Sequence, residues 1–356
     1  MLRHWRREGR DPEGRGTIIP EYDVPSGLMP LHIAALQDGR LTGKEIPAAI
    51  IDLAVKGHLV IQRVTDDGLI FDTTDYSLLE TTKRPETGSI ESVLLEALFT
   101  STQSSVDTAG VRKFLATPQA KFLPGFLKRS IEASLPKEVS AAEMTLRSVK
   151  VSELKNKFYT QIPELQKRAV ADLVAQKLYE ASPQEIWQKY ALAGVAIFFA
   201  AFFLIPMLNL QVASVAALFV TIPIYFVFVY LMPRVTRAGA ITKEQLLGLK
   251  DYLRIAEKNR LEFHNAPEKT PELFERLLPA ALLLGVSDIW AKEFADISLS
   301  EPEWYQGGNV ASFSAASFAT DLGSFHAAAA SSFASAPSGS GSGGGGFSGG
   351  GGGGSW

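Results

Sequence analysis

The side chains that most often carry out chemistry are sparse in this sequence. It contains no cysteine and five histidines, so thiolate nucleophiles, disulfides and cysteine-containing metal sites are excluded. Glu257, Glu262 and His264 lie close enough in sequence to assist a metal ion, but at the end of a charged helix a solvated surface is the favoured interpretation. We therefore expect no catalytic residue, no cofactor and no metal site, and we expect that the protein is not an enzyme.

Glycine-rich sequence can also do chemistry, because backbone amides can hold phosphates. Residues 339–354 are rich in glycine, but no strand is predicted before them and no helix after them, as a phosphate-binding loop requires. The formal net charge is −3, so no overall basic balance attracts the chain to nucleic acid. The sequence therefore indicates neither a phosphate-binding loop nor binding of nucleic acid. The apolar segments and the predicted helices and strands are more informative.

The most distinctive feature of the chain is an uncharged stretch between Lys189 and Arg234, which contains no Asp, Glu, Lys or Arg. Two apolar runs, 191–208 and 212–232, are separated only by a short turn at 209–211. A helix needs about 20 apolar residues to cross roughly 30 Å of hydrocarbon, and each run is about that long. The pattern predicts a two-helix transmembrane hairpin over residues 187–234.

Aromatic and basic residues flank this hairpin, as is typical of a membrane interface. Basic flanks remain on the cytoplasmic side, so we predict a multi-pass protein of the cell membrane with its N- and C-terminal regions cytoplasmic. The lipid bilayer is then one partner. The expected membrane-interface residues are Trp187, Lys189, Tyr190, Tyr230, Arg234 and Arg237.

Residues 28–86 have the outline of a winged-helix-like domain. Helices are predicted at 31–36 and 44–56. A strand at 58–64, a turn at 66–68 and strands at 69–72 and 76–79 follow them and form a small β-hairpin wing. Between Asp38 and Glu80, four basic residues stand against eight acidic ones. Because phosphates would be repelled by such a surface, docking of a protein partner is favoured over binding of nucleic acid.

The rest of the chain divides by composition. The overall prediction is a mainly α fold, in which the hairpin anchors cytoplasmic domains. Thr242 and Gln245 fit a capping box at the start of a helix. Ala, Ser and Gly dominate the C-terminal end, where too little apolar surface is expected to offset ordering. The further predicted regions are a basic juxtamembrane segment (1–27), a helical domain (87–186), a cytoplasmic helical segment (235–306) and a disordered Gly/Ser/Ala/Phe-rich tail (307–356).

Several stretches of the chain are distinctive in combination: 9–12, 20–28, 52–59, 250–261, 271–281, 284–290 and 302–305. Together they resemble the YciQ-like family of predicted bacterial membrane proteins, which carry domain of unknown function 2207. The resemblance implies a membrane location and this architecture, but no catalytic residues. Members of the family usually have a signal peptide, an exported domain and a further span before this region, so the chain is expected to be the C-terminal part of a longer protein.

Three functions are compatible with these features. The favoured hypothesis is a membrane-anchored scaffold or protein-interaction module whose partner is a protein. The first alternative is a membrane-tethered winged-helix regulator that binds DNA. The second is a non-catalytic component of a transport or envelope system, although transport usually requires ionisable residues at membrane depth, and the two apolar runs contain none.

Overall fold

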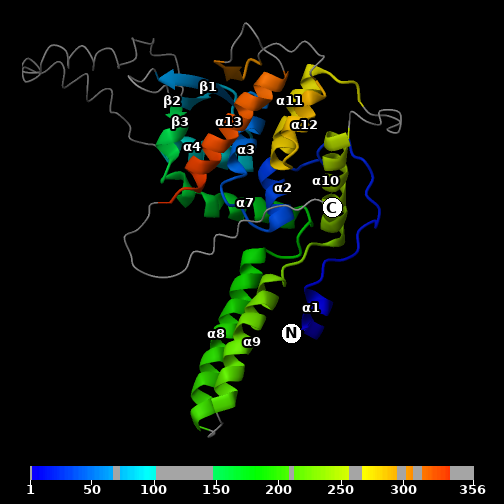
Figure 1. Cartoon of the computed structure of the whole chain (residues 1–356), viewed down its shortest axis with the longest axis vertical. Helices are drawn as coiled ribbons and strands as arrows, with labels where there is room; N and C mark the ends of the chain where they lie inside the picture. Colours follow the sequence, from blue (N-terminus) through cyan, green and yellow to red (C-terminus); the bar gives the residue numbers. More distant parts are fainter. Residues whose placement is uncertain are drawn as a thin grey trace, which may run out of the picture.

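A helical body and a long pair of helices that projects from it make up the chain in the computed structural model (Figure 1). The structure describes residues 2–66, 73–101, 147–207, 212–255, 267–294, 302–307 and 315–336. The prediction of a mainly α fold with a small β element is confirmed. The predicted turn at 209–211 and the tail beyond 336 lie outside the described residues.

The β element is a four-stranded mixed sheet with the order β3-β2-β1-β4. Strands β1 (Leu59–Asp66) and β2 (Thr73–Glu80) form the predicted antiparallel hairpin. Strand β3 (Ser148–Lys150) pairs antiparallel with β2, and β4 (Tyr305–Gln306) pairs parallel with β1. The two outer strands are very short, and they join segments from distant parts of the chain to the hairpin.

Local capping explains several of the helix boundaries. The hydroxyl of Ser89 accepts a hydrogen bond from the amide of Ser92, and that of Thr270 accepts one from Leu273, each at 3.2 Å. The body also has 3-10 turns at Val151–Leu154 and Phe158–Thr160. Its helices include α2 (Pro30–Asp38), α3 (Ile46–Val55), α4 (Ile90–Thr100), α7 (Ile162–Ala175), α10 (Arg237–Ile255), α11 (Pro271–Leu283) and α12 (Ser287–Lys292).

Helix α3 is central to the body. Eight of its 10 residues are buried, and it packs against α2, α11 and α13 (Ala315–Ala334). The order of helix, helix and hairpin agrees with the predicted outline of residues 28–86, while the assignment as a winged helix stays a prediction.

The C-terminal helix α13 corrects one prediction. Residues 307–356 were expected to be disordered, but Ala315–Ala334 form a helix. Phe318, Phe325 and Phe333 are all buried on its inner side, and the Phe333 ring lies 4.7 Å from that of Phe158. The prediction failed because it rested on the Ala/Ser-rich composition of the segment. The three phenylalanines form an apolar stripe on one side of the helix, and other parts of the body cover this stripe.

The buried side chains form one hydrophobic cluster that includes residues from all three predicted cytoplasmic regions. It joins α2 and α3 to α7, α10, α11 and α13. Residues 28–86, 87–186 and 235–306 therefore contribute to a common core, and the boundaries drawn between them stay predictions.

Helices α8 (Pro183–Met207) and α9 (Val212–Tyr230) lie side by side and extend away from the body (Figure 1). Gly194 permits their close approach, because a Cβ atom at this position would lie 2.4 Å from the ring of Tyr225. Among the described residues, one segment, Pro183–Phe203 of α8, is long and apolar enough to cross a membrane, and the apolar stretch Val220–Tyr230 of α9 is shorter.

Candidate membrane-interface site

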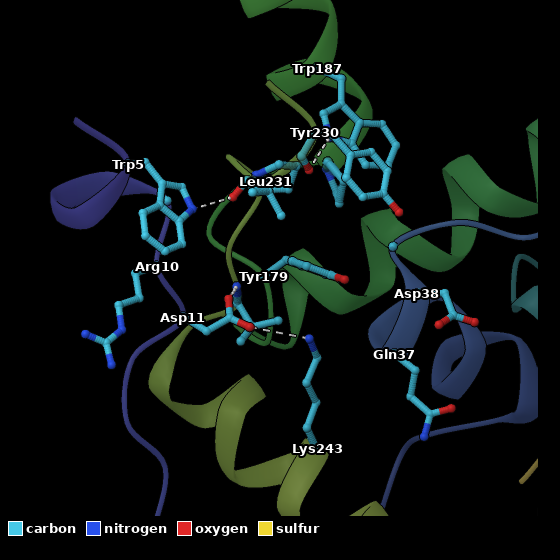
Figure 2. A pocket seen from close by; sticks show the side chains of 15 residues that line it. Trp5, Arg10, Asp11, Gln37, Asp38, Tyr179, Trp187, Tyr230, Leu231 and Lys243 are labelled. Atoms are coloured by element: carbon cyan, nitrogen blue, oxygen red, sulfur yellow. Dashed lines mark hydrogen bonds and ion pairs between the residues drawn. The ribbon is translucent and has the colours of Figure 1, made fainter. Parts of the chain in front are cut away.

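A cavity of about 300 Å³ lies where the helix pair α8–α9 meets the body. It is bounded by α1 (Leu2–Glu8) and the segment after it, by the end of α2, by the start of α8, by the end of α9 and by α10. Figure 2 shows the side chains around it, with the aromatic rings on the side of α8 and α9 and the charged groups toward the body. The cavity thus combines apolar and charged walls.

Three aromatic residues, Trp5, Trp187 and Tyr230, form what we call the aromatic collar. The rings of Trp187 and Tyr230 are stacked, with centroids 5.9 Å apart and planes 5° apart. The indole N–H of Trp187 donates to the carbonyl of Tyr230 at 3.3 Å, and that of Trp5 donates to the carbonyl of Leu231 at 3.1 Å. The collar therefore closes around the end of α9, and its indole groups have hydrogen-bond partners, as buried or interfacial indoles require.

Glycine at position 9 allows the N-terminal segment to join the collar. A Cβ atom on Gly9 would lie 2.6 Å from Trp5 and 3.0 Å from the sulfur of Met232. Contacts this short do not occur for real Cβ atoms, so a larger residue would push α1 away from α9.

Four charged residues line the cavity: Arg10, Asp11, Asp38 and Lys243. One carboxylate oxygen of Asp11 accepts a hydrogen bond from the amide of Val235 at 3.0 Å, and the other lies 3.6 Å from the ammonium of Lys243. Within the part of the chain that the structure describes, neither Arg10 nor Asp38 is engaged in an ion pair. Their charges are available to a bound molecule.

The cavity is held in shape by the junction between α7 and α10. The amide of Thr236 donates to the carbonyl of Leu178 at 3.0 Å, and Tyr179 forms a β-bridge with Val235. The hydroxyl of Tyr179 donates to the carbonyl of Ala35 at 3.0 Å. Burial raises the pKa of Tyr179, so this hydroxyl stays protonated and continues to donate. The start of α8 and the end of α9 are thereby tied to α2.

The structure brings some of the predicted interface residues together and separates others. Trp187 and Tyr230 are two of the three residues of the collar. Arg234 makes two hydrogen bonds to the carboxylate of Glu180, at 2.9 and 2.7 Å. The carbonyl of Tyr190 accepts from the hydroxyl of Tyr225 at 2.7 Å, between the two helices.

The two remaining predicted residues, Lys189 and Arg237, are exposed on α8 and at the start of α10. A place at a membrane interface stays a prediction for the whole set. The sequence reasoning missed Asp11, Asp38 and Tyr179. No local pattern marks them, because each comes from a different segment.

The lining of the cavity contains groups that can form hydrogen bonds and ion pairs with a polar ligand. It contains cations, carboxylates and aromatic faces, but none of its residues is cysteine or histidine. Among the described residues, no group of three or more His, Cys, Asp or Glu could hold a metal ion. Glu257, Glu262 and His264 lie outside the described residues.

Comparison with known protein families gives one match. The family described as "Predicted membrane protein (DUF2207) C-terminal domain" matches residues 17–294. The chain belongs to this family. The resemblance noted from the sequence is thus confirmed, and so is its description as a predicted membrane protein of unknown function. No curated protein and no solved structure gave a significant match.

Proposed function

We propose that this member of the DUF2207 family is a membrane-anchored scaffold. Helices α8 and α9 would cross the bilayer as a hairpin, and the body would dock a protein partner on the cytoplasmic side. The observation that carries the proposal is the exposure of α8: none of its most apolar 18-residue window is buried within the chain. A monomeric soluble protein rarely exposes a large continuous apolar surface.

The individual side chains support a lipid environment around both helices. Leu192 and Phe203 on α8 are 70% and 71% exposed, and Val220 on α9 is 63% exposed. Transferring such side chains from water to hydrocarbon stabilises each by about 1.5–3 kcal/mol. A soluble core helix would instead bury one face and show a polar stripe on the other.

Charge supports the cytoplasmic orientation. Arg234 and Arg237 follow α9 directly, and Lys177 and Lys189 lie before and early in α8. The turn at 209–211 carries no charge. Because basic flanks favour the cytoplasmic side, the turn is placed outside and the body inside.

The interior of the body favours docking over DNA binding. A winged-helix regulator would present one helix to the major groove, and here α3 is the helix before the hairpin and is enclosed by α2, α11 and α13. The hairpin region is acidic as well. These two features give the regulator hypothesis little support.

Cysteine labelling tests the topology, because the native chain has no cysteine. Asn209→Cys should react with an impermeant thiol reagent added to intact cells. Glu153→Cys and Ser324→Cys lie on exposed parts of the body and should react only after the membrane is opened. Labelling of either body position in intact cells would contradict the cytoplasmic orientation.

Crosslinking in cells tests the scaffold role separately. The full chain should recover a reproducible protein partner, and a matched chain reduced to residues 183–234 should not. Equal recovery by both chains would assign the contact to the membrane hairpin. Recovery of DNA by the full chain at low salt would support the regulator hypothesis instead.

A further inference from the structure

The charges around the cavity at the base of α8 and α9 are separated by sign. Arg10 and Lys243 lie on the sides formed by the N-terminal segment and α10, while Asp38 lies at the end of α2 on the opposite side from Arg10 (Figure 2). Counting Asp11, the lining has two cations and two carboxylates. A ligand that is neutral overall but carries separated charges matches this lining better than a simple anion or cation does.

The aromatic collar places the cavity at a definite depth if α8 and α9 are inserted. Trp and Tyr concentrate at the level of lipid headgroups, and the exposed apolar surface of α8 begins only beyond the collar. The cavity is therefore at headgroup level, next to the acyl chains. This step rests on the proposed membrane insertion.

The two oppositely charged sides of the cavity would contact different ends of a lipid headgroup. Arg10 and Lys243 offer N–H donors to a phosphate. Asp38 offers a carboxylate to an ammonium, and Trp187 lies nearby, because a Cβ atom on Gly39 would be 3.8 Å from its ring. Aromatic faces attract ammonium groups. An ammonium group can donate a hydrogen bond to the Asp38 carboxylate only if it carries N–H groups. A primary ammonium has them, and a quaternary ammonium does not.

We propose that this cavity binds the headgroup of a zwitterionic phospholipid that carries a primary ammonium. The phosphate lies between Arg10 and Lys243, and the ammonium is directed to Asp38. The volume of about 300 Å³ is at the lower end for small-ligand sites, which suits a headgroup whose acyl chains remain outside along α8. A purely anionic headgroup would bring its charge toward Asp11 and Asp38.

The test measures which lipid the full chain retains. The chain is reconstituted in phosphatidylcholine vesicles containing equal amounts of phosphatidylethanolamine and phosphatidylglycerol, extracted in mild detergent and analysed by native mass spectrometry. The wild-type chain should retain phosphatidylethanolamine over both other lipids. Asp38→Asn should lower that preference by about three- to tenfold, as expected for the loss of one charge-assisted hydrogen bond at a partly exposed site.

Matched variants separate the site from general charge effects. Asp288→Asn removes an exposed carboxylate on α12 that does not line the cavity, and should retain the wild-type preference. Arg10→Gln and Lys243→Gln should lower retention of all phospholipids. Equal retention of the three lipids by the wild-type chain, or an unchanged preference in Asp38→Asn, would overturn the proposal.

Two further measurements are needed. One distinguishes failure of membrane insertion from failure of the headgroup site, and the other distinguishes a lipid ligand from a soluble one. Flotation of the same vesicles reports insertion: a chain that does not float refutes the proposed membrane anchor, and a chain that floats without lipid preference refutes only the headgroup site. Free phosphoethanolamine should not displace the retained lipid. Displacement at millimolar concentration would assign the site to a soluble phosphate–ammonium compound and overturn the lipid assignment.

Discussion

Replacing Phe325 by alanine tests whether α13 is part of the core. The Phe325 side chain is 0% exposed, and its ring packs edge-on against Tyr76 on β2, with centroids 5.2 Å apart. The same stretch of α13 is attached by an ion pair between Asp321 and Arg63 at 3.0 Å. Substitution to alanine leaves that ion pair in place and removes only the ring.

The expected cost follows from the buried area. A phenylalanine buries roughly 150–250 Å², and apolar area contributes about 25 cal/mol per Å², which gives roughly 4–6 kcal/mol for the whole side chain. Alanine retains part of this contribution, while the vacated space adds a cavity penalty. We expect Phe325→Ala to lower the free energy of unfolding of the body by about 3–5 kcal/mol.

Pulse proteolysis of the full chain in detergent micelles, across a urea series, measures this free energy without requiring the hairpin to unfold. Ser324→Ala is the matched control, because Ser324 is exposed on the neighbouring position of the same helix and should change stability by less than about 0.5 kcal/mol. If Phe325→Ala proved as mild as Ser324→Ala, α13 would not be docked as described, and a disordered C-terminal region would be the better account.

Three other substitutions probe buried contacts by the same measurement. Arg147→Ala should cost about 1–3 kcal/mol, because the carboxylate of Glu80, whose side chain is 1% exposed, loses two hydrogen bonds from Arg147 at 2.7 and 2.8 Å but keeps its ion pair with Arg84. Gly239→Ala should cost about 1–3 kcal/mol, because its Cβ atom would lie against the carbonyl oxygen of Leu178. Burial lowers the pKa of His32, against the opposing effect of Asp172. The folded state then binds fewer protons, so His32 stabilises it above pH about 6.5 and loses this contribution as pH falls. His32→Gln should flatten the decline in stability between pH 7 and 5.

The first two substitutions have a matched control in the chain. Glu96→Gln changes the exposed partner of Arg147 and should cost less than about 1 kcal/mol. Gly323→Ala adds a methyl group to α13 where no atom lies within 4 Å, so it should be neutral or stabilise by about 0.5–1 kcal/mol. An unchanged pH profile in His32→Gln would mean that other groups, such as His326, whose pKa burial also lowers, account for the decline.

Local sequence signals predicted the local elements well. The helices predicted at 31–36 and 44–56 correspond to α2 and α3, and the strands predicted at 58–64 and 76–79 correspond to β1 and β2. The strand predicted at 69–72 lies outside the described residues. The capping box at Thr242 was wrong. Helix α10 begins at Arg237, and the Thr242 hydroxyl donates to the carbonyl of Ala238 at 3.0 Å within the helix. A cap is a weak signal where the preceding residues can also be helical.

Elements that depend on distant partners were not predictable from local patterns. Strand β4 has only two residues, and Tyr305 is placed by pairing with Ile61. The cavity is a stronger example, because Asp11, Asp38 and Lys243 meet only once α2 and α10 are packed together. The collar residues Trp187 and Tyr230 were identifiable, since they lie near the ends of apolar runs that are themselves visible in the sequence.

The family match ends at residue 294, but residues after 294 also pack into the core of the body. Phe318 contacts the rings of Phe274, Trp304 and Tyr305, at centroid distances of 6.3, 5.6 and 5.2 Å. A chain ended after residue 294 would lack Trp304, Tyr305 and Phe318, and would leave the Phe274 ring and the edge of β1 uncovered on the sides that these residues occupy.

We therefore expect a chain of residues 1–294 to aggregate on extraction in detergent, whereas a chain of residues 1–336 should remain monodisperse and unfold at the same urea concentration as the full chain. Gel filtration and pulse proteolysis distinguish these outcomes. If residues 1–294 proved as stable as 1–336, α13 would contribute nothing to the body, and the apolar stripe on α13 would need another partner. The matched comparison separates α13 from residues 337–356, which are absent from both truncated chains.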